Sequence, residues 1–257
     1  IVMLMSDHGS RFSGIRSSVQ GKYEERFPYF AIYFPDAFKV KYPSAYANFK
    51  DNIDKLTTPL DIHATLQNML KYIGDENIDI HNMREISLFQ KISDDRTCAD
   101  AGIDPHWCTC LNWQQVNTTD TNLAAATEHF ISFINKLTSD YREKCHILTL
   151  DHIKNAFKYQ PNEKLLKFKK SNLVNYEAIP DFTDDMKPEV LYQITLQTVP
   201  NNGLYEVTLN YNPSTDKFSV SSGDVSRINK YGDQPKCIQH EHPHLRQYCY
   251  CKTSHKI

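Results

Sequence analysis

The chain begins with Ile1-Val2-Met3-Leu4-Met5-Ser6-Asp7-His8-Gly9, an apolar run that ends on an Asp-His-Gly turn. Consecutive apolar residues bounded by small and polar ones are typical of a parallel strand buried on both faces. Ligands of α/β proteins bind at the carboxyl ends of such strands, where Asp7 and His8 stand. A carboxylate and an imidazole suit zinc or a similar divalent ion, and Gly9 permits a sharp turn after them. The stretch therefore predicts a strand that delivers two metal ligands, against the alternative of an ordinary strand end with a hydrogen-bonded histidine.

The composition of the 257 residues bounds the class of protein. Hydrophobic residues make up 40%, charged residues 23%, and the formal net charge is -2. This balance predicts a folded chain and gives no reason to expect nucleic acid as a partner. No apolar run approaches the length of a transmembrane segment, and the first residues lack the features of a signal peptide. Because the chain opens inside an expected core strand, we interpret it as the C-terminal part of a longer protein.

Seven cysteines point to disulfides and to an oxidising compartment. They are Cys98, Cys108, Cys110, Cys145, Cys237, Cys249 and Cys251. Clustered cysteines favour disulfides, and therefore the secretory pathway or the extracellular space. The members of each Cys-x-Cys pair are too close to bridge comfortably with one another, so each sulfur is expected to have a distant partner. Because seven is odd, one thiol is free, or its partner lies in another part of the protein or in another chain.

An N-glycosylation acceptor and a polar loop add weaker signals. Asn117-Thr118-Thr119 agrees with secretion, although such triplets often occur by chance. The loop after Gly9 contains Arg11, Arg16 and several serines. Guanidinium groups hold tetrahedral anions through paired hydrogen bonds, so this loop would suit a phosphate or sulfate ester beside a metal, with Arg11 as the candidate contact. A solvated surface loop is an equally good interpretation.

A helix is predicted to begin at Pro59 and to continue to about Gly74. Thr58 is a natural N-cap, proline suits the first helical position, and Asp61 falls where a carboxylate meets the free amides. His63 lies near the start of this helix, where a lone histidine is more often packed or hydrogen-bonded than a ligand. Upstream, an aromatic run at residues 28–35 predicts a strand, and apolar spacing at residues 43–56 predicts another helix.

The later part of the chain predicts an α+β region. Residues 122–144 carry one apolar stripe at helical spacing, and residues 145–150 have the pattern of a strand. Two alternating segments flank Asn202-Gly203, and Asn212-Pro213 makes a second break, which predicts a three-stranded antiparallel meander against the helix. The histidines and cysteines at residues 237–251 would suffice for a zinc site, but we favour structural disulfides because their spacing matches no finger pattern.

Three stretches together resemble the second half of the catalytic domain in the alkaline phosphatase and sulfatase superfamily. They are Ser6-Asp7-His8-Gly9, Gly21-x-x-Glu24-Glu25-Arg26-x-Pro28 and Asn52-x-x-x-Leu56-Thr57-Thr58-Pro59-Leu60-Asp61-Ile62-His63-Ala64-Thr65-Leu66. In particular the chain resembles an animal branch, domain of unknown function two-two-nine, whose members also carry Ile86-Ser87-Leu88-Phe89, Arg96-x-Cys98 and Trp107-Cys108-x-Cys110. The resemblance is clear over residues 1–115 and loose beyond them. One departure is Glu85, where the family pattern would have glycine.

The resemblance implies a fold and a set of ligands. The fold would be α/β, the C-terminal part of an alkaline-phosphatase-like sandwich, followed by a small α+β layer with an antiparallel sheet. Asp7 and His8 match the pair that binds the metal nearest the nucleophile, and His63 matches the late histidine that binds the other metal of the two-metal enzymes. The metal would be zinc, or calcium in a sulfatase-like protein. The chain lacks the Cys/Ser-x-Pro-x-Arg motif of sulfatases, and the nucleophile would lie upstream.

These observations lead to two functional hypotheses. The first is the C-terminal portion of a metal-dependent hydrolase of phosphate or sulfate esters, whose substrate is a small anionic ester or a glycan and which is inactive as this portion alone. The second is a non-catalytic extracellular binding or structural protein that retains the fold. The expected organisation is part of the catalytic domain at residues 1–75, a Cys-rich connecting segment at residues 76–121, and the α+β region at residues 122–257.

Overall fold

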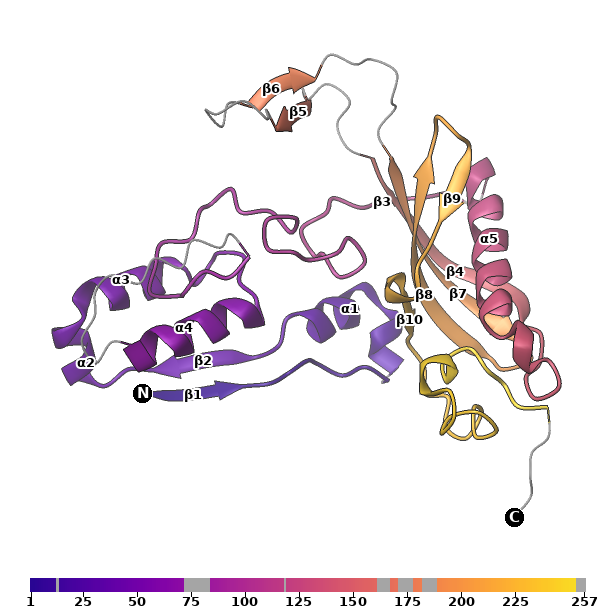
Figure 1. The fold of residues 1–257 in the computed structure, drawn as a ribbon, viewed down its shortest axis with the longest axis horizontal. Coiled ribbons are helices and arrows are strands. Elements are labelled where there is room, and N and C mark those ends of the chain that lie inside the picture. The colour runs from indigo at the N-terminus through magenta and orange to yellow at the C-terminus, as the bar shows by residue number, and fades with distance from the viewer. Residues whose placement is uncertain are drawn as a thin grey trace. The chain divides into compact units, whose positions relative to one another are not determined.

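The computed structural model describes residues 1–12, 14–71, 84–117, 119–160, 167–170, 178–181 and 189–252. The chain divides into two compact units. The first unit comprises residues 1–10 and 18–111, and the second comprises residues 11–17 and 112–257. Both units contain helices and strands, so the chain belongs to the mixed α/β class that the sequence predicted (Figure 1). Within the described residues, no helix combines the length and the apolar character needed to cross a membrane.

The first unit contains a two-stranded sheet of β1 (Val2–Met5) and β2 (Phe30–Tyr33) (Figure 1). The prediction of a parallel strand buried on both faces is wrong, because β1 pairs antiparallel with β2, and Val2 and Leu4 are each 63% exposed. Val2 lies opposite Tyr33, which is 64% exposed. Residues directly opposite in an antiparallel pair point to the same face. The sheet therefore has one apolar face that the described residues leave largely uncovered.

The helices described in the first unit lie between and after these strands. They are α1 (Val19–Arg26), α2 (Asp36–Lys41), α3 (Pro43–Asp51) and α4 (Pro59–Lys71). The predicted helices that start at Pro43 and Pro59 are confirmed as α3 and α4, whereas α1 and α2 were not predicted. Phe34, Ala45 and Phe89 form a small buried cluster, against which Ile32 of β2 and Met69 of α4 also pack. Aromatic packing therefore joins the helices to one side of β2.

The segment 84–111 belongs to the first unit and is held by polar contacts and a disulfide. The side chain of Asn52 donates to the carbonyl oxygens of Leu88 (3.1 Å) and Gln90 (2.7 Å) and accepts from the amide of Ile92 (3.1 Å). Cys98 and Cys108 form a disulfide across this segment. An asparagine at the end of α3 thus satisfies backbone groups that no helix or strand would satisfy.

The second unit is built on an antiparallel sheet with the strand order β10-β8-β7-β4-β3, in which β9 also pairs with β8. Its strands are β3 (Gln114–Gln115), β4 (Thr149–Tyr159), β7 (Val190–Val199), β8 (Gly203–Asn212), β9 (Lys217–Ser219) and β10 (Val225–Arg227). The predicted meander is confirmed as β7, β8 and β9. The strand expected at residues 145–150 begins later, at Thr149, because Cys145 makes only an isolated bridge with Cys251. A separate pair, β5 (Lys167–Lys170) and β6 (Ala178–Asp181), is also antiparallel.

Helix α5 (Thr121–Leu137) covers one face of this sheet (Figure 1). Its buried side chains include Phe130 and Ile134, which belong to the same core cluster as Ile194, Leu196 and Val207 of the strands. Asp120 caps the helix by accepting a hydrogen bond from the amide of Asn122 at 2.9 Å. The apolar stripe predicted for residues 122–144 is therefore the core face of α5, although the helix ends seven residues earlier, at Leu137.

Two disulfides hold the C-terminal segment, and one of them joins it to the region after α5. Cys145 bonds to Cys249 and Cys237 bonds to Cys251. The Sγ atoms of Cys237 and Cys249 lie 3.8 Å apart, so the two bridges are neighbours. The predictions of structural disulfides and of distant partners for the Cys-x-Cys sulfurs are confirmed for Cys108, Cys249 and Cys251. The remaining thiol, Cys110, is free and exposed.

Because Tyr205 and Tyr248 are buried, we expect the second unit to become less stable at alkaline pH. Tyr205 is fully buried, its hydroxyl donates to the carbonyl oxygen of Gln247 at 2.6 Å, and burial raises the pKa of both Tyr205 and Tyr248. Free tyrosines ionise near about pH 10, so above that pH the unfolded chain has released protons that the folded chain retains. The free energy of unfolding should therefore fall as pH rises beyond this point. We expect the tyrosinate absorbance to rise in two waves, the second coinciding with unfolding.

Tyr248→Phe provides the control for this prediction. It removes one of the buried phenols, so the alkaline loss of stability should be smaller than in the unsubstituted chain. A single reversible titration of all tyrosines near the pH of free tyrosine, with the circular dichroism of the folded chain unchanged, would contradict the prediction.

Candidate functional site

The end of β1 is fixed by backbone hydrogen bonds on both sides of the Asp-His pair. The amide of Ser6 donates to the carbonyl oxygen of Tyr29 at 2.9 Å, and the amide of Tyr29 donates to the Ser6 hydroxyl at 2.9 Å. Two residues after Asp7, the amide of Gly9 donates to the carbonyl oxygen of Glu25 in α1 at 3.2 Å. Asp7 and His8 are therefore held between two anchored points of the chain.

Gly9 is required because the backbone of α1 passes very close to it. A Cβ atom at this position would lie 2.1 Å from the carbonyl oxygen of Glu24, a distance at which the backbone must shift. We expect Gly9→Ala to lower the free energy of unfolding by about 1–3 kcal/mol, the usual cost of forcing extra volume into a packed site. Chemical denaturation followed by circular dichroism measures this difference.

Gly14→Ala is the matched control for Gly9→Ala. A Cβ atom at Gly14 meets nothing within 4 Å. The substitution should leave stability within about 0.5 kcal/mol of the unsubstituted chain, as surface changes usually do. Equal effects of the two substitutions would show that the close approach at Gly9 is not what constrains the turn.

Asp7 and His8 are spaced as two ligands of one ion would be. The Nδ1 atom of His8 lies 2.5 Å from the carbonyl oxygen of Gly9, and because a carbonyl only accepts, Nδ1 is the donor. The neutral ring then has its lone pair on Nε2, which lies 3.4 Å from Oδ2 of Asp7. Two atoms bound to a tetrahedral zinc at about 2.0–2.1 Å stand about 3.3 Å apart. A ring nitrogen that donates to a backbone carbonyl is also the usual outer partner of a metal-binding histidine.

His63 stands in a different setting, on the exposed side of α4. Its side chain is 58% exposed, and its Nδ1 atom lies 3.8 Å from a carboxylate oxygen of Glu85. Its Nε2 atom lies 3.4 Å from the side-chain amide nitrogen of Gln67, one turn further along the helix. Glu85 is the residue at which the sequence departs from the family pattern. The departure therefore places a carboxylate beside the histidine that the resemblance assigns to the second metal.

A buried ion pair fixes the start of α4 and the segment that carries Glu85. The guanidinium of Arg96 donates to both carboxylate oxygens of Asp61, at 2.8 and 3.0 Å. Asp61 also accepts from the amides of Thr58 (2.7 Å) and Ile86 (2.8 Å). The sequence placed Asp61 at the free amides of the helix start but gave no sign of Arg96 as its partner. His63 and Glu85 thus project from two segments that this network ties together.

The structure brings the predicted ligands together as separate pairs. Asp7 and His8 form one pair, and His63 stands with Glu85. Among the described residues, groups of three whose ligand atoms all lie within 4.8 Å of one another consist of cysteines. Paired ions lie roughly 4 Å apart, and each ligand reaches only about 2 Å. The two pairs are therefore not joined into one group of three ligands among the described residues.

The two arginines of the loop after Gly9 have different surroundings. Residues 11–17 belong to the second unit, in which Arg16 is 1% exposed and its Nη2 atom lies 3.4 Å from a carboxylate oxygen of Glu206. Arg16 is therefore not available as an anion contact, because a carboxylate of the same unit lies against its guanidinium. Arg11 is exposed, and its role as an anion contact stays a prediction.

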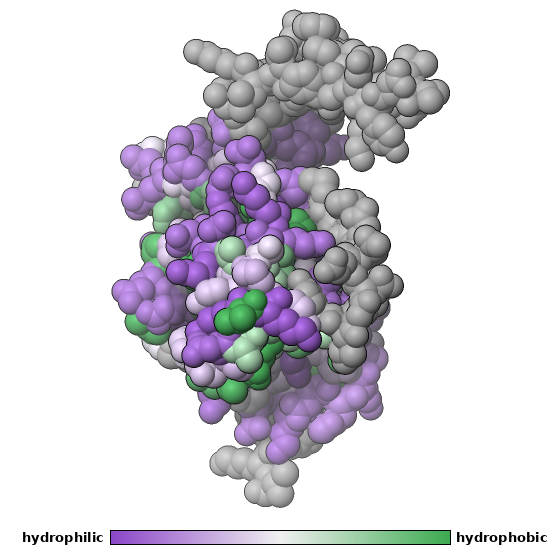
Figure 2. All heavy atoms as spheres, turned by 90° about the vertical axis from the view of Figure 1, so that its left-hand side faces the viewer, coloured by the Kyte–Doolittle hydropathy of each residue, from purple (hydrophilic) through white to green (hydrophobic). Residues whose placement is uncertain are grey.

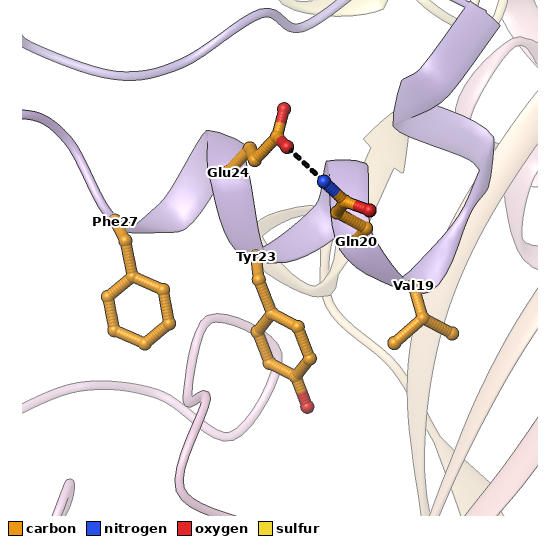
Figure 3. A pocket seen from close by; sticks show the side chains of 5 residues that line it. All are labelled: Val19, Gln20, Tyr23, Glu24 and Phe27. Atoms are coloured by element: carbon orange, nitrogen blue, oxygen red, sulfur yellow. Dashed lines mark hydrogen bonds between the residues drawn. The ribbon is translucent and has the colours of Figure 1, made fainter.

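A surface hollow of about 520 Å³ lies along α1 (Figure 3). It is lined by Val19, Gln20, Tyr23, Glu24 and Phe27. Figure 3 shows Val19, Tyr23 and Phe27 pointing to the same side of the helix, while Gln20 donates to Glu24 at 2.7 Å. The rings of Tyr23 and Phe27 stack with their centroids 6.1 Å apart. Because its lining contains an acidic but no basic residue, this hollow does not suit an anionic ester.

The comparison with known proteins identifies a family. A family model described as "Protein of unknown function (DUF229)" matches residues 1–154. No curated protein and no solved structure matches the chain. The matched range is more than half of the chain, and it includes Asp7, His8 and His63. The chain therefore belongs to the DUF229 family of proteins of unknown function.

Proposed function

We propose that the chain is the C-terminal portion of a metal-dependent hydrolase of phosphate or sulfate esters, of the alkaline phosphatase and sulfatase type. The observation that carries the proposal is the Asp7–His8 pair. Its ligand atoms are 3.4 Å apart, and the second ring nitrogen of His8 is occupied by the Gly9 carbonyl. This arrangement places one carboxylate oxygen and one ring nitrogen at the separation that a tetrahedral ion requires.

Each residue has a distinct task in this proposal. Asp7 supplies negative charge to one ion, and His8 supplies a neutral nitrogen whose tautomer the Gly9 carbonyl fixes. His63 serves a second ion, with the Glu85 carboxylate 3.8 Å away to orient its ring or to share the ligation. Bound ions of this kind activate a hydroxyl nucleophile and neutralise charge on the transferred group. Arg11 remains the candidate contact for the anionic part of a small ester or glycan substrate.

The donor set favours zinc over calcium. Calcium takes oxygen ligands, whereas zinc binds imidazole nitrogen together with carboxylate oxygen. Two of the three proposed ligands are histidines, so a calcium-dependent sulfatase site fits these residues less well than a two-metal phosphatase or phosphodiesterase site. The lack of a Cys/Ser-x-Pro-x-Arg motif in this chain agrees with that preference.

The uncovered face of the first unit's sheet supports a larger catalytic domain. Val2, Leu4 and Tyr33 are each more than 60% exposed, and other apolar side chains also reach the surface on the side shown in Figure 2. Two strands alone are marginally stable in water, and sheets of this kind are normally completed by further strands and helices. Additional protein over this face would bury the apolar side chains and bring further metal ligands to the ends of the strands.

Zinc binding by the chain tests the ligand assignment. Isothermal titration is performed on the Cys110→Ser variant, so that the exposed thiol does not contribute to binding. We expect His8→Ala in this background to weaken the tightest zinc site at least tenfold. His240→Ala, in the C-terminal segment, should leave that site unchanged. Equal zinc affinity with and without His8, while circular dichroism shows both variants folded, would refute the assignment.

The alternative is a non-catalytic extracellular protein that retains the fold. It is favoured by the apolar hollow along α1, which suits a protein or lipid contact better than an ester, and by Glu85 in place of the expected glycine. Three disulfides in the described part of the chain are compatible with an extracellular location for either function. A folded chain that binds no zinc in the titration above would favour this alternative.

A further inference from the structure

Three cysteine sulfurs meet at the end of the segment 84–111. Cys98 and Cys108 form a disulfide, and Cys110 is a free, exposed thiol. The Sγ atoms of all three lie within 4.8 Å of one another. The disulfide itself is shielded, because Cys98 is 8% and Cys108 only 2% exposed. The exposed Cys110 thiol therefore lies beside the buried Cys98–Cys108 disulfide, and disulfides are the bonds that thiolates attack.

The backbone around these sulfurs is fixed by hydrogen bonds. The amide of Ile103 donates to the carbonyl oxygen of Cys98 at 2.8 Å, and the amide of Cys108 donates to that of Asp104 at 3.0 Å. The neighbouring Trp107 ring lies under the guanidinium of Arg26, 5.3 Å from the ring centre. The segment thus holds Cys98 and Cys108 in place, with the sulfur of Cys110 within 4.8 Å of both disulfide sulfurs.

We propose that Cys110 is the attacking thiol of an internal thiol–disulfide exchange with the Cys98–Cys108 bond. Cys110 loses its proton to water, and its thiolate attacks Sγ of Cys98. A Cys98–Cys110 bond forms as the Cys98–Cys108 bond breaks, and the electron pair passes to Sγ of Cys108, which takes a proton from water. One disulfide replaces another, so no external oxidant or reductant is consumed.

Cys98 is the sulfur that is attacked because of the spacing of the other two. Cys108 and Cys110 are separated by a single residue, a spacing at which the geometry of a disulfide is difficult to reach. Attack on Cys98 instead forms the Cys98–Cys110 bond. The loop that this bond closes is similar in size to the loop that the Cys98–Cys108 bond had closed. Cys108 is then the leaving group, and its thiol is left at a position that is 2% exposed.

The exchange converts an exposed thiol into a buried one. A thiol at the surface reacts with oxidants, metals and other disulfides, whereas one in apolar surroundings is inert. The attacking species is the thiolate, so exchange should accelerate as pH rises. Cys98 also lies two residues from Arg96, whose guanidinium holds Asp61 at the start of α4. The disulfide isomer therefore acts on the same segment that anchors α4.

Isomer mapping on the unsubstituted chain tests the exchange. The folded chain is incubated at pH 6 or pH 8.5, quenched with acid, denatured and alkylated, and the alkylated cysteine is located by peptide fragmentation. We expect alkylated Cys108 to appear alongside alkylated Cys110, and to accumulate faster at the higher pH. Cys145–Cys249 and Cys237–Cys251 should stay intact as internal controls. Alkylation of Cys110 alone at every time, or a dimer linked through Cys110, would overturn the proposal.

Single substitutions give an independent readout as thiol counts after folding in a glutathione redox buffer. Cys108→Ser should contain no free thiol, because Cys98 and Cys110 then pair with one another. Cys98→Ser should contain two, because Cys108 and Cys110 are too close to pair comfortably. Two free thiols in a folded Cys108→Ser variant would overturn the proposal. If that variant does not fold, the mapping on the unsubstituted chain decides.

Discussion

Replacing Asp61 by asparagine is expected to lower the free energy of unfolding of the first unit by about 3–5 kcal/mol, the usual cost of breaking a buried ion pair. Asp61 is 0% exposed and Arg96 is 9% exposed, so neither charge is well solvated. Asparagine keeps the size of the side chain but loses its charge and one acceptor, which takes from the guanidinium of Arg96 the carboxylate that binds both of its terminal nitrogens. Urea denaturation followed by circular dichroism measures the loss.

Asp100 provides the matched control for Asp61. It also accepts from the amide and hydroxyl of a threonine, Thr97, at 2.9 and 2.8 Å, but it is exposed. Those hydrogen bonds lower the pKa of Asp100. Asp100→Asn should cost about 1 kcal/mol or less, as expected for a surface capping residue. If Asp61→Asn were no more damaging than Asp100→Asn, the buried pair would not be what holds α4 to the segment 84–96.

A second variant separates the charge from the packing. Removing both partners, as Asp61→Asn with Arg96→Met, leaves no uncompensated charge in the interior. The double variant should therefore be more stable than Asp61→Asn alone, because apolar replacements of buried ion pairs are often nearly neutral. A double variant that is less stable than either single one would contradict an electrostatic origin of the effect.

The parts of the fold that the sequence predicted correctly depend on local chemistry. Thr58, Pro59 and Asp61 mark a helix start within four residues, and α4 begins at Pro59. Asn202-Gly203 marks a turn between two alternating segments, and β7 and β8 pair across it. In each case the residues from which the element was predicted are the same residues that form it. The apolar run of β1 predicted a strand for the same reason, but its neighbours lie elsewhere in the sequence, so their direction and the exposure of the strand were missed.

In the candidate site too, contacts between sequence neighbours were predicted, whereas contacts between distant residues were not. Asp7 and His8 are adjacent in the sequence, and the structure brings their ligand atoms together. His63 and Glu85 come together only through folding, and the Glu85 contact was not predicted. Arg96 pairs with a residue 35 positions away, and Arg16 with one 190 positions away. A single charged residue carries no periodic signal that names its partner, which is why the ion pairs of Arg16 and Arg96 were not predicted.

Arg16→Met is expected to lower the free energy of unfolding of the second unit by about 3–5 kcal/mol, again as the cost of breaking a buried ion pair. Arg16 is among the largest fully buried side chains, and Glu206 is only 3% exposed. Glu206 lies within β8, opposite Thr195 of β7 and Ser226 of β10, so its carboxylate stays in the sheet when the arginine is removed. The loss should depend little on salt, because buried pairs are weakly screened.

The same substitution should also release the loop that follows the Asp-His-Gly turn. Arg16 anchors residues 11–17 to the second unit, so trypsin should cleave after Arg11 faster in Arg16→Met than in the unsubstituted chain. Arg16→Met with Glu206→Gln should recover part of the stability, because the Glu206 charge is removed together with the guanidinium that faces it, yet cleavage at Arg11 should stay fast. Stability restored together with slow cleavage would mean that packing, and not the ion pair, holds the loop. Unchanged stability in Arg16→Met would show that the Glu206 carboxylate is satisfied by its other neighbours.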